Sequence, residues 1–220
     1  MGIGRLSNES PEYSKRRDEL LEAEIALRDQ VERVAELRRR LPIDTAVADT
    51  TFEEIRDGVR VPVRLSELFE DPDKTLVLVH FMFGGRQSTP CPMCTLWADG
   101  YDGIVPHLRQ RVNFAVLVAG DVGVFGEYAR QRGWRNLRLV SAADSDLKRS
   151  LGFEAEDGGQ HPGVSVFRRL DDGRLVHFAS VCAMPARGEF RGMDLLSPLW
   201  NFLDLTPEGR GDWMPRIGYD

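Results

Sequence analysis

An apolar face runs along residues 11–41 at helical spacing, and charged residues fill most of the other positions. The face consists of Leu20, Leu27, Val31, Val34 and Leu41. Ser10-Pro11 fits an N-cap followed by proline in the first turn, and Pro42 fits the end of the helix. We expect this amphipathic helix to pack against the rest of the chain or against a second copy in a homodimer.

Beyond residue 45 the pattern changes to short apolar runs that alternate with helical segments. A hairpin is predicted around the turn dipeptide Asp57-Gly58, and a second around residues 171–173. The other predicted strands cover residues 75–83, 112–118 and 137–141, and the second hairpin covers 164–179. The predicted helices cover residues 91–108, 125–132, 144–151 and 193–203.

The resulting order of strands and helices is β-α-β-α-β-α-β-β-α, which implies a parallel sheet with right-handed crossovers. The closing hairpin adds an antiparallel edge. We therefore predict an α/β fold, a thioredoxin-like three-layer α/β/α arrangement with a central mixed sheet, plus the N-terminal amphipathic helix. The expected division is a helical extension over residues 1–45 and a thioredoxin-like domain over residues 46–220.

Composition and charge argue against nucleic-acid binding and membrane association. The 220 residues carry a formal net charge of −6, which argues against nucleic acid as a partner because phosphate binding needs a basic surface. The longest apolar run, residues 76–83, is too short to span a bilayer, so no membrane association is expected. The first residues lack the apolar core of a signal peptide. These features favour a cytoplasmic location, where thiols stay reduced.

The motif Cys91-Pro92-Met93-Cys94 is the strongest chemical signal, because it stands at the predicted start of a helix. Unpaired N–H groups and the positive end of the helix dipole favour a thiolate there. Cys91 is the expected nucleophile, and Cys94, one turn later, is the expected resolving thiol. Such a pair is more often redox-active or metal-binding than structural in a reducing compartment.

Other residues near the motif are candidates for the same site. His80, at the end of the preceding strand, would handle protons for the resolving cysteine because imidazole titrates near neutral pH. Pro162 is a candidate cis-proline that would let an extended substrate pair with the backbone. Phe83 and Trp97 flank the cysteines and complete the expected substrate-binding set.

A second hypothesis assigns a metal to the same pair. Two thiolates from Cys91 and Cys94 with the imidazole of His161 would suit copper or zinc. This layout resembles that of copper-handling thioredoxin-like proteins of the Sco type. Those proteins have three residues between their cysteines, whereas this chain has two.

Longer blocks of the chain carry a further resemblance, namely His80–Gly84, Cys91–Gly103, Val164–Phe167 and Leu203–Trp213. They resemble a bacterial family known as domain-of-unknown-function family 899, which is placed among thioredoxin-like proteins. The resemblance extends from the N-terminal helix to the tail. It implies the fold and leaves the activity open.

We expect an enzyme, a thiol–disulfide oxidoreductase or thiol peroxidase-like protein that needs no cofactor for disulfide exchange. Its substrate would be a thiol or disulfide in a small molecule or a protein. The alternatives are the copper or zinc protein described above and a non-catalytic thioredoxin-like module that binds a partner.

Overall fold

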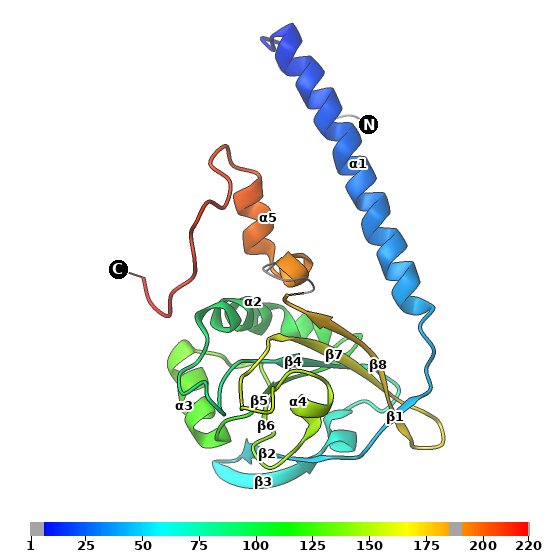
Figure 1. The fold of residues 1–220 in the computed structure, drawn as a ribbon, viewed down its shortest axis with the longest axis vertical. Helices are drawn as coiled ribbons and strands as arrows, with labels where there is room; N and C mark the ends of the chain where they lie inside the picture. Colours follow the sequence, from blue (N-terminus) through cyan, green and yellow to red (C-terminus); the bar gives the residue numbers. More distant parts are fainter. Residues whose placement is uncertain (1–6, 185–190, 220) are drawn as a thin grey trace. The chain divides into compact units, whose positions relative to one another are not determined.

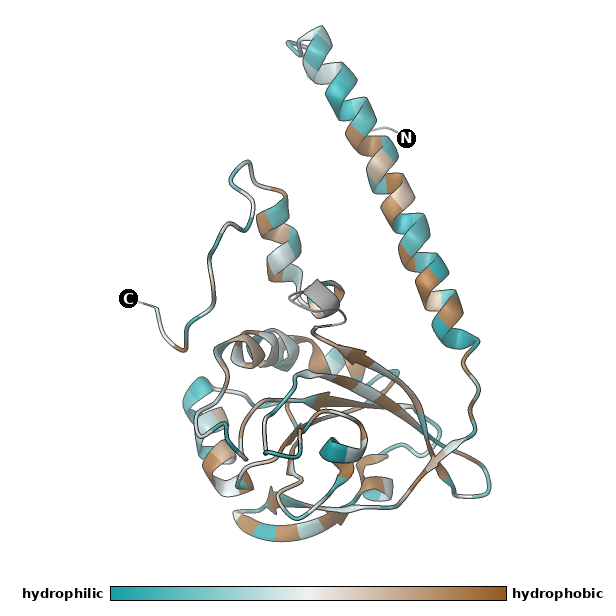
Figure 2. Cartoon of the chain, viewed as in Figure 1, coloured by the Kyte–Doolittle hydropathy of each residue, from teal (hydrophilic) through white to brown (hydrophobic). Residues whose placement is uncertain are grey.

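The computed structural model of this chain describes residues 7–184 and 191–219. Its contacts divide into two compact units, Met1–Pro42 and Ile43–Asp220, and each is described by itself. The first unit contains helix α1 (Pro11–Arg39), which the N-terminal periodicity predicts (Figure 1). Ser10 caps it by accepting a hydrogen bond from the backbone N–H of Tyr13 at 3.1 Å. None of the residues of α1 is buried, and apolar and polar residues are interleaved along it (Figure 2).

The second unit is built around one sheet of eight strands among the described residues, in the order β1-β8-β7-β4-β5-β6-β2-β3. The strands are β1 (Thr45–Val47), β2 (Thr51–Arg56), β3 (Val59–Arg64), β4 (Leu76–His80), β5 (Asn113–Val118), β6 (Leu139–Ser141), β7 (Gly163–Arg169) and β8 (Leu175–Cys182). The helices are η1 (Leu65–Leu68), α2 (Pro92–Leu108), α3 (Val122–Arg132), α4 (Leu147–Ser150), η2 (Arg191–Leu196) and α5 (Pro198–Asp204). Strands β4, β5 and β6 run parallel, and β7 is antiparallel to β4.

Each face of the sheet buries its own hydrophobic core, because successive side chains of a strand point to opposite faces. On one face Val116 and Val118 of β5 pack with residues of α2 and α3. On the other face Ala115 and Leu117 of the same strand pack with η1 and α4. The mixed sheet with helices on both sides is the predicted three-layer arrangement, and the prediction is confirmed.

Three elements differ from the sequence prediction. Strand β1 was not foreseen; its three residues pair antiparallel with β8 at the sheet edge. Strand β4 ends at His80, where its pairing with β5 and β7 ends, and not at Phe83. The last predicted helix is divided at Ser197 into η2 and α5, because Pro198 can begin a helix but cannot continue one.

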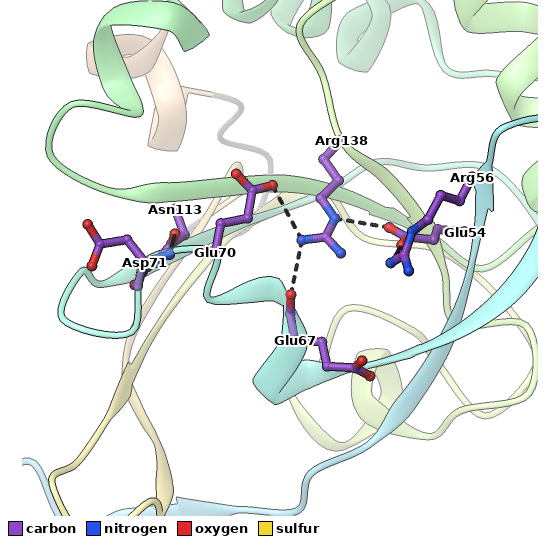
Figure 3. Close-up of polar contacts among 7 residues, drawn as sticks. All are labelled: Glu54, Arg56, Glu67, Glu70, Asp71, Asn113 and Arg138. Atoms are coloured by element: carbon purple, nitrogen blue, oxygen red, sulfur yellow. Dashed lines mark hydrogen bonds and ion pairs between the residues drawn. The ribbon is translucent and has the colours of Figure 1, made fainter.

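The β2–β3 hairpin turns at Asp57-Gly58, both with positive φ (53° and 78°), as a two-residue turn of this type requires. A buried ion pair fastens it to the sheet (Figure 3). Arg138, beside β6, donates to the carboxylate of Glu54 at 3.0 Å and to the carbonyl oxygen of Glu67 at 3.1 Å. The side chains of Arg138 and Glu54 are only 15% and 8% exposed.

Candidate thiol site

The two cysteines of the motif lie at the start of α2. Cys91 is the N-cap residue and Pro92 occupies the first turn, as the sequence predicts. The backbone N–H of Cys91 donates to the carbonyl oxygen of Met82 at 3.2 Å, which ties the motif to the loop after β4. Both cysteines are free thiols; Cys91 is partly buried and Cys94 is 2% exposed. The pair therefore presents one accessible sulfur in front of one enclosed sulfur.

The surroundings of the two cysteines shift the pKa values of their thiols in opposite directions. A hydrogen bond with the Cys94 thiol, helped by the backbone N–H groups of Cys94 and Met93, lowers the pKa of Cys91 to about 6 against the opposing effect of burial. Burial raises the pKa of Cys94 well above its ordinary value, and the neighbouring Cys91 raises it further. Near neutral pH Cys91 is then a thiolate and Cys94 a thiol that donates to it.

The loop that carries the motif is held close to the end of β5. Gly84 has a φ of +100°, and a Cβ atom there would lie 2.0 Å from the backbone nitrogen of Gly120. The carbonyl oxygen of Phe83 accepts from the N–H groups of Ala119 and Gly120, each at 2.9 Å. The ring of Phe83 is 6% exposed and stacks on Phe125 with centroids 5.6 Å apart. Its side chain belongs to the core, and the contact of Phe83 with substrate stays a prediction.

Trp97 lies in the same core, with 4% of its surface exposed. It shares the buried face of α2 with Cys94 and with Tyr101, one turn further on. Neither the indole N–H of Trp97 nor the hydroxyl of Tyr101 has a hydrogen-bond partner among the described residues. Burial and the nearby Cys94 raise the pKa of Tyr101, which keeps its hydroxyl protonated. Trp97 therefore packs in the same hydrophobic cluster as the cysteine pair, inside the protein.

His80 is fully enclosed, with 1% of its surface exposed, and its ring stacks on Phe153 with centroids 3.8 Å apart. The alternation along β4 sends its side chain to the opposite face from Val79, which packs in the cluster that contains Cys94. Burial lowers the pKa of His80 well below its ordinary value, and the charges of Lys148 and His177 lower it further. His80 is thus a neutral imidazole, and its role in proton transfer stays a prediction.

A chain of hydrogen bonds leads from His80 across the sheet. Its Nε2 lies 2.8 Å from the Ser165 hydroxyl, which lies 2.8 Å from the Ser180 hydroxyl. That oxygen is in turn 2.8 Å from Nε2 of His177. His177 and Ser180 line a surface cleft of about 690 Å³ between β1, β8 and α4. The second nitrogen of His80, Nδ1, is buried without a partner among the described residues.

Pro162 precedes β7. Because His80, the last residue of β4, pairs with Gly163, Pro162 lies at the end of the sheet where the cysteine loop begins. Every peptide bond that the structure describes is trans, so the candidate cis-proline is a trans-proline. Pro162 is buried, and its carbonyl oxygen accepts from Ala183 at 3.2 Å. Pairing of its backbone with a substrate stays a prediction.

The ligand set of the metal hypothesis is not assembled. Among residues 7–184 and 191–219, no three His, Cys, Asp or Glu side chains are grouped so that they could hold a metal ion. His161, although it precedes Pro162 at this edge, does not form such a group with Cys91 and Cys94. Copper or zinc binding by this set therefore stays a prediction that would need a rearranged His161.

Sequence reasoning missed Lys148 of α4. Its side chain is 0% exposed, and its ammonium group donates to the carbonyl oxygen of Phe81 at 3.5 Å. Burial lowers the pKa of Lys148 to about 8, although the charges of Cys94 and Glu154 act in the opposite direction. Nothing in the sequence marks this lysine, because it stands among charged and polar residues in a short helix and reads as exposed.

The fold and the paired thiols define a thioredoxin-type α/β protein, and solved structures of peroxiredoxins share its fold. The peroxiredoxin Q of Xanthomonas campestris is 15% identical and has a TM-score of 0.50, covering 71% of this chain and 93% of its own. Reduced Prx3 of Vibrio vulnificus in complex with hydrogen peroxide is 18% identical, with a TM-score of 0.48 over 71% of this chain and 97% of its own. The likeness to peroxiredoxin Q, at 15% identity, shows the fold alone.

The sequence itself gives the family. A family model of bacterial proteins of unknown function, DUF899, matches residues 5–218, so the chain belongs to that family. This confirms the resemblance found in the sequence. No curated protein matches the chain. No helix among the described residues is both long enough and apolar enough to cross a bilayer.

Proposed function

We propose that this protein is a two-electron thiol oxidoreductase that acts through Cys91 and Cys94. The observation that supports it best is the contrast within the pair: a partly exposed Cys91 with a pKa of about 6, hydrogen-bonded to an enclosed Cys94 with a raised pKa. Disulfide exchange requires a thiolate nucleophile, and a second thiol beside it can resolve the mixed disulfide.

In the proposed reaction the Cys91 thiolate attacks one sulfur of a substrate disulfide. A bond forms between the two sulfurs, and the other substrate sulfur leaves as a thiolate that takes up a proton. Cys94 then attacks Cys91, which closes the Cys91–Cys94 disulfide and releases the second substrate thiol. An external dithiol returns the two electrons and restores both cysteines.

A hydroperoxide would enter the same cycle. Attack of Cys91 on the terminal oxygen breaks the O–O bond, releases an alcohol or water after protonation, and leaves a sulfenic acid on Cys91. Cys94 condenses with that sulfenic acid, which gives the same disulfide and one water molecule. Both routes use one nucleophile and one resolving thiol, so an activity assay has to distinguish a disulfide substrate from a hydroperoxide substrate.

The test compares three serine variants with disulfide and hydroperoxide substrates, with a dithiol as reductant. We expect Cys91→Ser to abolish turnover and Cys94→Ser to accumulate a mixed disulfide at Cys91 that mass spectrometry detects. Cys182→Ser is the matched control: among the described residues its sulfur accepts a hydrogen bond only from the N–H of Met184, at 3.4 Å, and turnover should be unchanged. Full activity of Cys91→Ser with both substrate classes would refute the proposal.

A further inference from the structure

Burial of a lysine side chain is energetically unfavourable, because its ammonium group loses its hydration. Lys148 has no exposed surface, and its ammonium group lies at the carbonyl oxygen of Phe81, the first residue after β4. The ionisable groups that interact electrostatically with it are Cys94, Glu154 and His80. Its position therefore calls for a partner that carries negative charge.

Glu154 is an incomplete partner, because its carboxylate already forms an ion pair with Arg149 at 3.0 Å. His80 supplies no negative charge, because burial keeps its imidazole neutral and its charged form would repel Lys148. Cys94 remains, and it becomes an anion whenever it acts as a nucleophile. The charge of Lys148 favours that anion.

One peptide group connects the lysine with the sulfur. The carbonyl oxygen of Phe81 accepts from the ammonium group of Lys148 at 3.5 Å, and the backbone N–H of Met82, in the same peptide unit, lowers the pKa of Cys94. A cation on the carbonyl end polarises a peptide and makes its N–H a stronger donor, because linked hydrogen bonds reinforce one another. The ring of Phe81 and the side chain of Cys94 also pack in one buried cluster.

We propose that Lys148 is a positioning residue for the resolving step: its buried ammonium group holds the negative charge of Cys94, directly and through the Phe81–Met82 peptide, while Cys94 attacks the disulfide at Cys91. This inference rests on the proposed function. It assigns to a lysine from α4 the part that the sequence suggested for His80.

With Cys91 bound in a mixed disulfide, the thiol of Cys94 releases its proton to solvent, and the resulting thiolate attacks Sγ of Cys91. A Cys91–Cys94 bond forms while the mixed disulfide breaks, and its electron pair leaves on the substrate sulfur. That sulfur takes up a proton, so the charge held beside Lys148 disappears when the new bond forms.

The experiment uses a synthetic disulfide, so that it works whatever the natural substrate is. In the Cys182→Ser background, Ellman's reagent converts Cys91 into a mixed disulfide with thionitrobenzoate. Attack by Cys94 releases this coloured thiolate, and the rate of release as a function of pH reports the ionisation of Cys94. The full-length chain is used throughout.

We expect Lys148→Met to move the midpoint of this pH profile upward by about one pH unit or more and to slow release near neutral pH about tenfold, because an adjacent positive charge is lost. Lys148→Arg, which keeps the charge, should largely restore the profile. Lys74→Met is the matched control, since Lys74 pairs with Asp71 before β4 and should leave the profile unchanged.

A Lys148→Met profile that coincides with that of the parent would overturn the proposal, and so would equal shifts in Lys148→Met and Lys148→Arg. If Lys148→Met does not fold, Lys148→Gln, which keeps a hydrogen-bond donor but no charge, replaces it in the same assay, and a profile that coincides with that of the parent would overturn the proposal. Absence of turnover with every natural disulfide or peroxide would refute the proposed function alone, because the synthetic disulfide still tests Lys148.

Discussion

The acidity of Cys91 is the property on which the proposed chemistry depends, and its main cause can be removed by one substitution. The hydrogen bond from the Cys94 thiol is the largest contribution to a pKa of about 6 in place of 9.0. Cys94→Ala removes that donor but keeps the backbone N–H groups of Met93 and Cys94. Cys94→Ser keeps a hydroxyl donor at the same position, so the two variants form a matched pair.

The size of the effect follows from the two pKa values. Their difference is worth about 4 kcal/mol at about 1.4 kcal/mol for each pKa unit. Near pH 7 a thiol with a pKa of about 6 is roughly nine-tenths ionised, whereas a thiol at 9.0 is roughly one-hundredth ionised. In Cys94→Ala we expect a midpoint between these limits, because the N–H groups at the start of α2 still favour the thiolate.

The assay is alkylation by iodoacetamide in the Cys182→Ser background, with mass spectrometry to locate the adduct at Cys91. The rate constant is measured against pH, and its midpoint gives the pKa of Cys91. The expected order of midpoints is wild type lowest, Cys94→Ser intermediate and Cys94→Ala highest. A Cys94→Ala midpoint equal to that of the wild type would refute the hydrogen-bond explanation and leave the helix terminus as the cause.

Three further predictions concern stability, its dependence on pH, and metal binding. Arg138→Ala leaves the buried carboxylate of Glu54 without its main partner and should lower the free energy of unfolding by about 3 kcal/mol, measured by urea denaturation. Burial raises the pKa of Glu54, but the hydrogen bonds and charges of Arg138 and Arg56 outweigh it and lower the net value below 4.5. Glu54 therefore adds stability above pH 4.5 that is lost as the pH falls through the lowered pKa, and a pH-independent difference between wild type and Glu54→Gln would contradict this. The copper or zinc hypothesis predicts stoichiometric metal in the anaerobically reduced, desalted protein and its loss in Cys91→Ser, and elemental analysis that finds no metal in the wild type would refute it.

Local signals explain why much of the fold could be predicted. The period of the apolar positions separates helices from strands, and Pro92, Gly133 and the Asp57-Gly58 pair mark where elements begin, end or turn. Alternation within β4 also carries a signal about His80. It places His80 and Val79 on opposite faces of the sheet, and Val79 packs in the cluster that contains Cys94, while the role of His80 in proton transfer stays a prediction.

The sequence by itself determined the order of strands and helices and the cysteine pair at the start of α2, because these features depend on residues that are neighbours in the chain. Only the tertiary structure decided that three residues of β1 join the sheet edge, and that Lys148 is buried near Cys94 while His161 joins no metal-binding group with the cysteines. Those outcomes depend on which side chains meet after distant segments pack together. Residue spacing along the chain carries no record of such contacts.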